Sequence, residues 1–180
     1  NSCVSTSRTA VIATVITVPT ISGTTPASNC GTGTVTLQAS ASVGNVNWYD
    51  ASSNGNLLAS NTTSYTTTSI TSNTSYYAQA VNNGCFSVSR TAVLATIVTL
   101  PTISSTTAGE RCGTGTVSLG ANASSGSVRW FSAVSGGSSL LTGISYTTPS
   151  ISSTTTYYAE ALDQGCVSQS RSAVIATIKD

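Results

Sequence analysis

The stretch CGTGTVTLQASAS, residues 30–42, carries the pattern that decides the fold. Its apolar residues Val35, Leu37 and Ala39 alternate with polar neighbours. An alternation with a period of two predicts a β-strand with one buried and one exposed face. A nearly identical stretch, CGTGTVSLGANAS, occupies residues 112–124. The chain is therefore expected to contain repeated β structures rather than one continuous fold.

The repeat extends well beyond this stretch. Trp48 and Trp130 lie 82 positions apart, as do Cys30 and Cys112. The segment GCFSVSRTAVLATI at 84–97 returns as GCVSQSRSAVIATI after a similar interval. The spacing predicts two complete modules, which we place at residues 19–100 and 101–180.

Residues 1–18 match only the closing part of a module. Their sequence AVIATV at 10–15 corresponds to AVLATI at 92–97. We expect residues 1–18 to be the terminal strand of a preceding repeat or a strand for pairing between subunits. In the second case Val11, Ile12 and Val15 would form the assembly strand, because an unpaired apolar strand can complete the sheet of a neighbouring chain.

Each module reads as all-β. The sequences NNG at 82–84 and DQG at 163–165 favour tight hairpin turns, because they contain residues that tolerate positive φ. No apolar stripe at helical spacing is present. Six or seven short strands in about 80 residues, separated by turn signals, are typical of a β-sandwich. The predicted fold is therefore a tandem array of Ig-like Greek-key β-sandwich modules.

The two tryptophans are candidates for the core of each module. Trp48 is in phase with Val46, and Trp130 with Val128. This phase favours a buried indole between two sheets over an exposed platform on which a sugar ring would stack.

Four of the five cysteines fall into two classes: Cys30 and Cys112 precede GTG, and Cys85 and Cys166 follow Gly. Since each module holds one of each class, the spacing predicts the disulfides Cys30–Cys85 and Cys112–Cys166, and Cys3 is left unpaired or intermolecular. One objection stands, because in a simple Ig path these two positions lie at opposite ends of a module. Connectivity is not settled by sequence.

Composition excludes several classes of function. Charged residues make up 6% of the chain, against about 25% in an ordinary soluble domain. No basic run indicates nucleic-acid binding, and no apolar window of about 18 residues indicates a membrane span. The chain has no His and five scattered acids. These residues do not assemble a catalytic or calcium site, so we expect no enzyme activity and no cofactor or metal.

The motifs PTIS, CGTGTVTL, VNWYDA, SYYAQAVNNGC and SRTAVLAT together resemble the Ig-like repeats of large Bacteroidetes surface proteins, which include gliding-motility and other type IX-secreted adhesins. The resemblance covers nearly the whole chain. It implies export to the cell surface or medium, no cofactor, and service in a stalk or adhesive array. The cysteines agree with such an oxidising location.

The sequence is compatible with two functions from different classes. The first is a non-catalytic structural or adhesive repeat that forms a stiff stalk or filament, with neighbouring modules or other copies of the chain as partners. The Pro residues at the module joins, Pro19 and Pro101, favour an extended and stiff connection. The alternative is a carbohydrate-binding module that recognises surface glycans.

Overall fold

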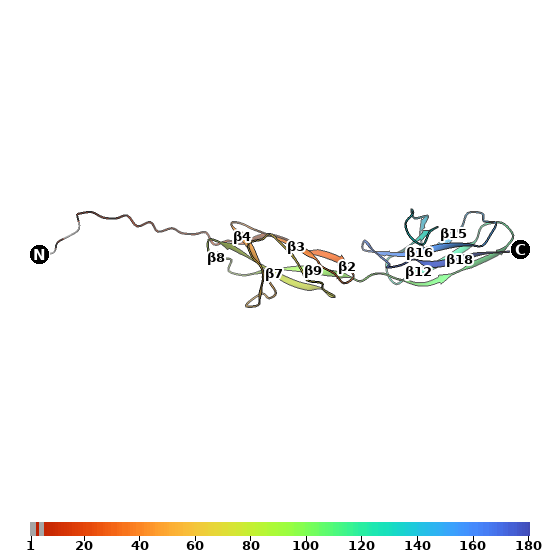
Figure 1. The fold of residues 1–180 in the computed structure, drawn as a ribbon, viewed down its shortest axis with the longest axis horizontal. Helices are drawn as coiled ribbons and strands as arrows, with labels where there is room; N and C mark the ends of the chain where they lie inside the picture. The colour runs from red at the N-terminus through yellow and green to blue at the C-terminus, as the bar shows by residue number, and fades with distance from the viewer. Residues whose placement is uncertain (1–2, 4–5) are drawn as a thin grey trace. The chain divides into compact units, whose positions relative to one another are not determined.

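The computed structural model describes residue 3 and residues 6–180, and every regular element in this part of the chain is a β-strand. The all-β prediction is confirmed. Two compact units are present (Figure 1). The first comprises Asn1–Ser28 and Thr34–Thr96, and the second comprises Asn29–Gly33 and Ile97–Asp180.

The first set of strands forms two sheets. The smaller has the order β1-β3-β6, and the larger has the order β2-β9-β7-β4-β5, with β8 paired to β7. The strands are β1 (Ile21–Thr25), β2 (Ala27–Cys30), β3 (Thr36–Ala41), β4 (Asn45–Tyr49), β5 (Leu57–Ala59), β6 (Ser64–Thr66), β7 (Thr74–Asn82), β8 (Cys85–Phe86) and β9 (Thr91–Val98).

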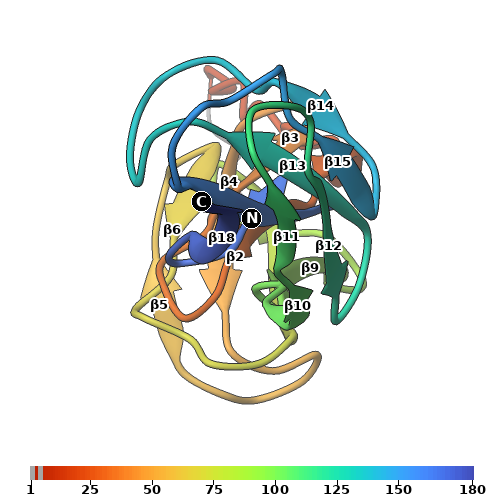
Figure 2. The same ribbon diagram turned by 90° about the vertical axis from the view of Figure 1, so that its right-hand side faces the viewer.

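The second set repeats this topology. Its sheets have the orders β10-β12-β15 and β11-β18-β16-β13-β14, with β17 paired to β16. Strand β11 lies beside β18 (Figure 2). This pairing is parallel, whereas the other pairings of this set are antiparallel. The strands are β10 (Ile103–Thr107), β11 (Gly109–Cys112), β12 (Ser118–Ala123), β13 (Ser127–Phe131), β14 (Leu141–Thr142), β15 (Ser145–Thr147), β16 (Thr155–Asp163), β17 (Cys166–Val167) and β18 (Ser172–Lys179).

The alternating side chains of the strands form the core. In β3, Leu37 and Ala39 are buried while their polar neighbours are exposed. The indole of Trp48 on β4 is fully buried and stacks on Tyr65 of β6, so the ring contact joins the two sheets. Trp130 and Tyr146 repeat this contact, with ring centroids 5.6 Å apart. Each module is thus a sandwich closed over one tryptophan.

The hairpins between β7 and β8 and between β16 and β17 have two-residue turns. Asn83 and Gly84 have φ of 46° and 82°, and Gln164 and Gly165 have 47° and 82°. Positive φ at both central residues is the type I′ geometry, whose twist matches that of the flanking strands. The NNG and DQG motifs therefore fold as the hairpin turns that the sequence indicates.

The predicted disulfides require correction, because the structure joins Cys30 to Cys166 and leaves Cys85 and Cys112 with free thiols. Cys30 lies beside the end of β9, since Gly31 N–H donates to the Val98 carbonyl. Cys85 lies near the start of β9, because β7 and β9 are antiparallel. The eight residues of β9 span about 24 Å, whereas a disulfide needs Cα atoms within about 7 Å. In Figure 1, β2 and β8 lie at opposite ends of their sheet.

The same geometry separates Cys112 from Cys166. Cys112 is in register with Lys179 at the end of β18, and Cys166 follows the turn at the end of β16. Strand β18 runs antiparallel to β16 and separates the two positions by its full length. The two cysteines of each repeat therefore lie at opposite ends of a module, and neither predicted pair can close within its own repeat.

Candidate functional site

The disulfide is the feature that links the two sequence repeats. Cys30 ends β2 and Cys166 begins β17, their Cα atoms are 5.5 Å apart, and 136 positions separate them in the chain. Residues 29–33 belong to the second compact unit, so the bond lies within that unit although Cys30 comes from the first repeat. Cys166 is buried, with 2% of its surface exposed.

Backbone contacts fix Cys30 in place. Gly31 has a φ of 68° and its N–H donates to the Val98 carbonyl at 2.8 Å. A Cβ on Gly31 would meet the Leu100 side chain at 3.3 Å, so the glycine lets the chain pass close to this residue. On the other side, the tight turn before Cys166 holds its Cβ on a rigid hairpin.

The remaining three cysteines carry free thiols. Cys3 and Cys112 are exposed, and Cys85 is half-buried. Cys112 is the repeat equivalent of Cys30, and Cys85 is the repeat equivalent of Cys166. Both classes of cysteine therefore occur once bonded and at least once free among the described residues.

One arginine in each module holds the long loop of that module. The Arg90 guanidinium lies 3.3 Å above the Tyr49 ring and donates to the carbonyls of Ala51 and Asn54. Arg171 lies 3.3 Å above the Phe131 ring and donates to the corresponding loop carbonyls at 2.7 and 2.8 Å. Cation–π stacking combined with backbone acceptors is a structural use of arginine, and it fixes the loop that follows β4 or β13.

The second module adds an ionic cluster at this place. Glu160 accepts from Arg129 through one carboxylate oxygen and from Arg171 at 3.2 Å through the other. The first module has the neutral Asn47 and Gln79 at the positions of Arg129 and Glu160. Sequence reasoning missed this cluster, although Arg129 and Glu160 face each other on β13 and β16.

The two tryptophans do not offer a platform for a sugar ring. Trp48 and Trp130 are fully buried, and their indole N–H groups donate to the Thr62 and Gly143 carbonyls. Tyr146 stacks against Trp130. Burial raises the pKa of the Tyr146 phenol above the ordinary 10.0, and the charge of a deprotonated Tyr157 is a smaller cause in the same direction. These groups are structural parts of the core.

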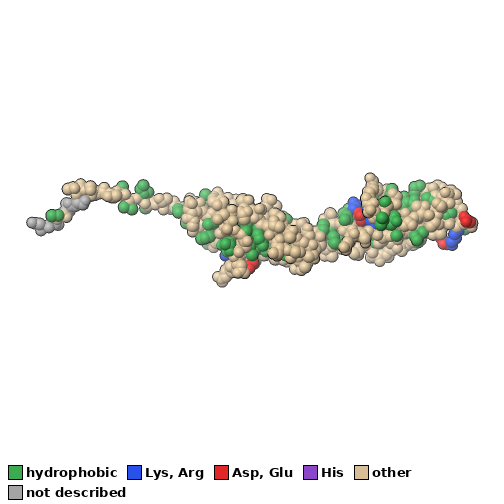
Figure 3. All heavy atoms as spheres, viewed as in Figure 1, with side chains coloured by type: hydrophobic (Ala, Val, Ile, Leu, Met, Phe, Trp, Pro, Cys, Tyr) green, Lys and Arg blue, Asp and Glu red, His purple; other side chains and the backbone are tan. Residues whose placement is uncertain are grey.

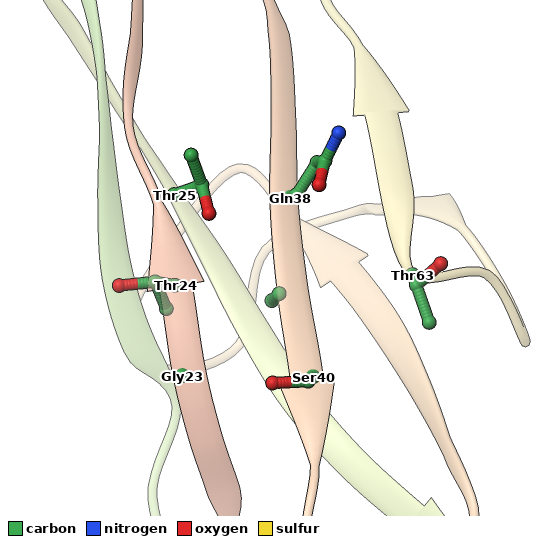
Figure 4. A pocket seen from close by; sticks show the side chains of 7 residues that line it. Gly23, Thr24, Thr25, Gln38, Ser40 and Thr63 are labelled. Atoms are coloured by element: carbon green, nitrogen blue, oxygen red, sulfur yellow. The ribbon is translucent and has the colours of Figure 1, made fainter.

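A shallow polar hollow lies over the β1-β3-β6 sheet (Figure 4). It has a volume of about 270 Å³, and no aromatic residue lines it. Its lining residues come from β1, β3 and the approach to β6: Gly23, Thr24, Thr25, Gln38, Ala39, Ser40 and Thr63. The hydroxyl and amide groups can exchange hydrogen bonds with a polar ligand, but no side chain there can stack on it.

The segment singled out for assembly forms no strand between Thr6 and Thr20. The side chains of Val11, Ile12 and Val15 are 92%, 87% and 94% exposed. Residues 1, 2, 4 and 5 of the predicted segment 1–18 lie outside the described residues. The equivalent strands β9 and β18 are each paired on both sides, whereas residues 10–15 belong to no sheet of the described part of the chain.

The described part of the chain holds few charged or metal-binding side chains. Three or more His, Cys, Asp or Glu residues nowhere gather closely enough to hold a metal ion in this part. None of its segments forms a helix with the length and apolarity needed to cross a membrane. Figure 3 shows few charged side chains on the visible face, which consists mainly of uncharged polar groups and backbone.

Comparison with known proteins identifies a family. The profile described as "Ig-like domain CHU_C associated" matches residues 17–98 and again residues 99–179. No curated protein matches the chain.

Two solved structures with TM-scores of 0.50 and 0.51 show the same fold at low sequence identity. Sidekick-1 immunoglobulin domains 1–5 match with a TM-score of 0.51 and 16% identity, covering 91% of this chain and 39% of that one. A chain from the complex of the mouse coronavirus receptor-binding domain with its murine receptor matches with a TM-score of 0.50 and 14% identity, covering 89% and 100%. Fibronectin(III)-like modules of Clostridium thermocellum CbhA match with a TM-score of 0.49 and 18% identity, covering 90% and 94%.

Proposed function

We propose, because the chain belongs to the CHU_C-associated Ig-like domain family, that its tandem modules serve as a non-catalytic, load-bearing segment of an extracellular stalk or adhesive array. The chain would then act by holding a distance and transmitting force, and its partners would be neighbouring modules of the same kind. The disulfide fits an oxidising location at the cell surface or beyond it.

One observation carries this proposal: a single disulfide brackets residues 30–166. A pull on the two ends of the chain passes through the two sulfur atoms and bypasses the backbone between them. The connection between β9 and β10 is also short, consisting of residues 99–102. Both features suit a segment that must not lengthen under tension.

Single-molecule stretching of the chain from its two ends tests the proposal. With the disulfide intact, only residues outside the bracket lengthen, by roughly 150 Å in total. Added reductant releases the 136 bracketed positions, a further gain of roughly 470 Å. A chain that reaches its full length without reductant does not carry load through this bond, and the load-bearing role is then rejected.

Carbohydrate binding is the second candidate, and the polar hollow over the β1-β3-β6 sheet is the observation that favours it. Its Thr, Ser and Gln groups offer both donors and acceptors to sugar hydroxyls. A glycan array tests this function, with Gln38→Ala as the matched variant. Binding that Gln38→Ala abolishes supports a lectin role, and silence over the whole array rejects it.

Residues 1–18 are assigned, within the same proposal, to the closing strand of a preceding module. Both modules of this chain already hold a strand of that type, β9 and β18, each next to two neighbours. A copy of the chain therefore offers no vacant place for Val11, Ile12 and Val15. Sedimentation of the chain with and without residues 1–18 tests this assignment, because loss of self-association on deletion would favour pairing between subunits instead.

A further inference from the structure

Cys112 is placed to form the same bond that Cys30 forms, but with a module beyond this chain's own two. Cys30 and Cys112 occupy equivalent positions in the CGTG motif, at the ends of β2 and β11. Gly31 donates to the Val98 carbonyl at 2.8 Å, and Gly113 donates to the Lys179 carbonyl at 2.9 Å. The backbone that presents the thiol is therefore the same in both repeats, and only one of the two thiols is bonded.

Cys85 is the other half of such a joint. The bonded Cys166 follows a two-residue type I′ turn that pairs Asp163 with it. Cys85 follows the same turn and pairs with Asn82. Since the φ angles of the two turns agree within a degree, the hairpin that receives Cys30 in the second repeat exists in the first repeat with its thiol free.

From this internal comparison we propose that Cys112 and Cys85 are covalent joints to further modules of the same family. Cys112 bonds the Gly-Cys hairpin of a following module, and Cys85 receives the CGTG cysteine of a preceding one. The bonded pair Cys30–Cys166 is the independent observation, because it shows the same two positions joined by a disulfide. The inference rests on the proposed array only in requiring a neighbouring module.

The chemistry needs a disulfide oxidant, for which oxidised glutathione serves. The Cys112 thiolate attacks one glutathione sulfur, forming a mixed disulfide and releasing one glutathione thiolate. The thiolate of the partner hairpin then attacks the Cys112 sulfur and releases the second glutathione. Two thiols lose two protons and two electrons, and one oxidised glutathione becomes two reduced molecules.

An ion pair between Glu110 and Lys179 lies next to Cys112. It measures 2.7 Å and links β11 to β18 beside Cys112, where the first repeat has the neutral Ser28 and Val98. Both partners are more than half exposed, so the pair leaves Cys112 accessible. A hairpin that docks beside Cys112 would therefore contact a charged rather than an apolar surface.

Two arms of one experiment distinguish where the partner module comes from. The first arm holds the full chain at high concentration in glutathione redox buffer, alkylates the remaining thiols and maps the disulfides by mass spectrometry. Trypsin separates Cys112 from Cys166 because it cuts after Arg129, and cleavage after Tyr49 separates Cys30 from Cys85. The second arm uses the full chain extended after Asp180 by a repeat of residues 100–180.

The proposal expects alkylation of Cys112 to fall at least about tenfold in one arm or both. A Cys112–Cys85 crosslink between chains identifies a second copy as the partner. A bond from Cys112 to the added Gly-Cys hairpin in the extended chain identifies a following module of the same polypeptide. Cys112→Ser removes either product, while Cys30–Cys166 stays intact and controls for folding.

Other outcomes overturn the inference. Cys112 that stays fully alkylated in both arms, in samples where Cys30–Cys166 is oxidised, shows that the joint does not form. Cys112 that bonds equally to Cys3, to Cys85 and to another Cys112 shows random oxidation of an exposed thiol. Alkylation of Cys30 and Cys166 removes the basis of the comparison. The Cys112→Ser variant keeps the Cys30–Cys166 bond, so its stretching curve still tests the load-bearing role. Failure of the joint can therefore be distinguished from failure of the proposed function.

Discussion

Breaking the disulfide at its exposed end is expected to destabilise the second unit strongly. The substitution Cys30→Ser removes the bond and leaves the buried Cys166 side chain unchanged. The bond closes a loop of 136 positions, and the chain-entropy relation assigns such a loop about 5 kcal/mol. A domain of this size has about 4–12 kcal/mol of stability in total. The loss is therefore comparable with the whole stability of a module.

Urea unfolding followed by tryptophan fluorescence measures this effect module by module. The chain has two tryptophans, one in each core, so Trp48→Phe leaves Trp130 as the reporter of the second unit. With a urea dependence of about 1–3 kcal/mol per molar, the midpoint is expected to fall by about 2–5 M. Oxidised and reduced wild-type chains give the same comparison without a substitution.

A control variant distinguishes the observed Cys30–Cys166 bond from the predicted bonds within each repeat. Cys85→Ser with Cys112→Ser removes only free thiols and is expected to change stability by less than about 0.5 kcal/mol. If this control lowers the midpoint as much as Cys30→Ser does, the bonds lie within the repeats and the reasoning is refuted. An unchanged midpoint in Cys30→Ser refutes it equally.

Three further changes test two turns and the aromatic core. Gly126→Ala is expected to cost at least about 2 kcal/mol in urea unfolding, because φ is 72° and the new Cβ would lie 2.2 Å from the Leu162 carbonyl oxygen; a cost below about 0.5 kcal/mol contradicts this geometry. Gln164→Asn is expected to stabilise by about 0.5–1 kcal/mol, since Asn tolerates the φ of 47° better than Gln, and a lower melting temperature would argue against a strained turn. Burial raises the pKa of Tyr146 above 10.0, so the unfolded chain loses its tyrosine protons first and stability falls as pH rises above about 10. Tyr146→Phe should weaken this decline in a series of unfolding curves from pH 7 to alkaline pH, and an equally steep decline would assign the effect to other groups.

The fold could be read from the sequence because local signals agreed with one another. Alternation at Val35, Leu37 and Ala39 set the strand face, and the NNG and DQG motifs set the turns. Trp48 was in phase with Val46, and the structure buries both. Each of these signals depends on residues close in sequence, which is why a single sequence was enough.

The cysteine pairing could not be read in the same way. The pairing prediction treated each repeat as a closed unit, whereas the bond joins the CGTG end of one repeat to the opposite, Gly-Cys end of the next. The loop-clamping role of Arg90 and Arg171 was also only partly readable, since their acceptors are backbone carbonyls and carry no sequence signal. The recurrence of an aromatic residue at Tyr49 and Phe131, in phase with these arginines, is the sequence signal for the stacking.

The position of the disulfide also decides what a protease can do to this molecule. Residues 30–166 form one closed covalent ring with the bond, and an exposed loop such as residues 134–140 lies inside it. A single cut in that loop opens the ring, but the two fragments stay joined through sulfur. Separating the two ends of the chain there takes a reductant, because even a second cut inside the ring leaves Cys30 bonded to Cys166. A chain built this way keeps its two ends covalently joined after a nick in such a loop.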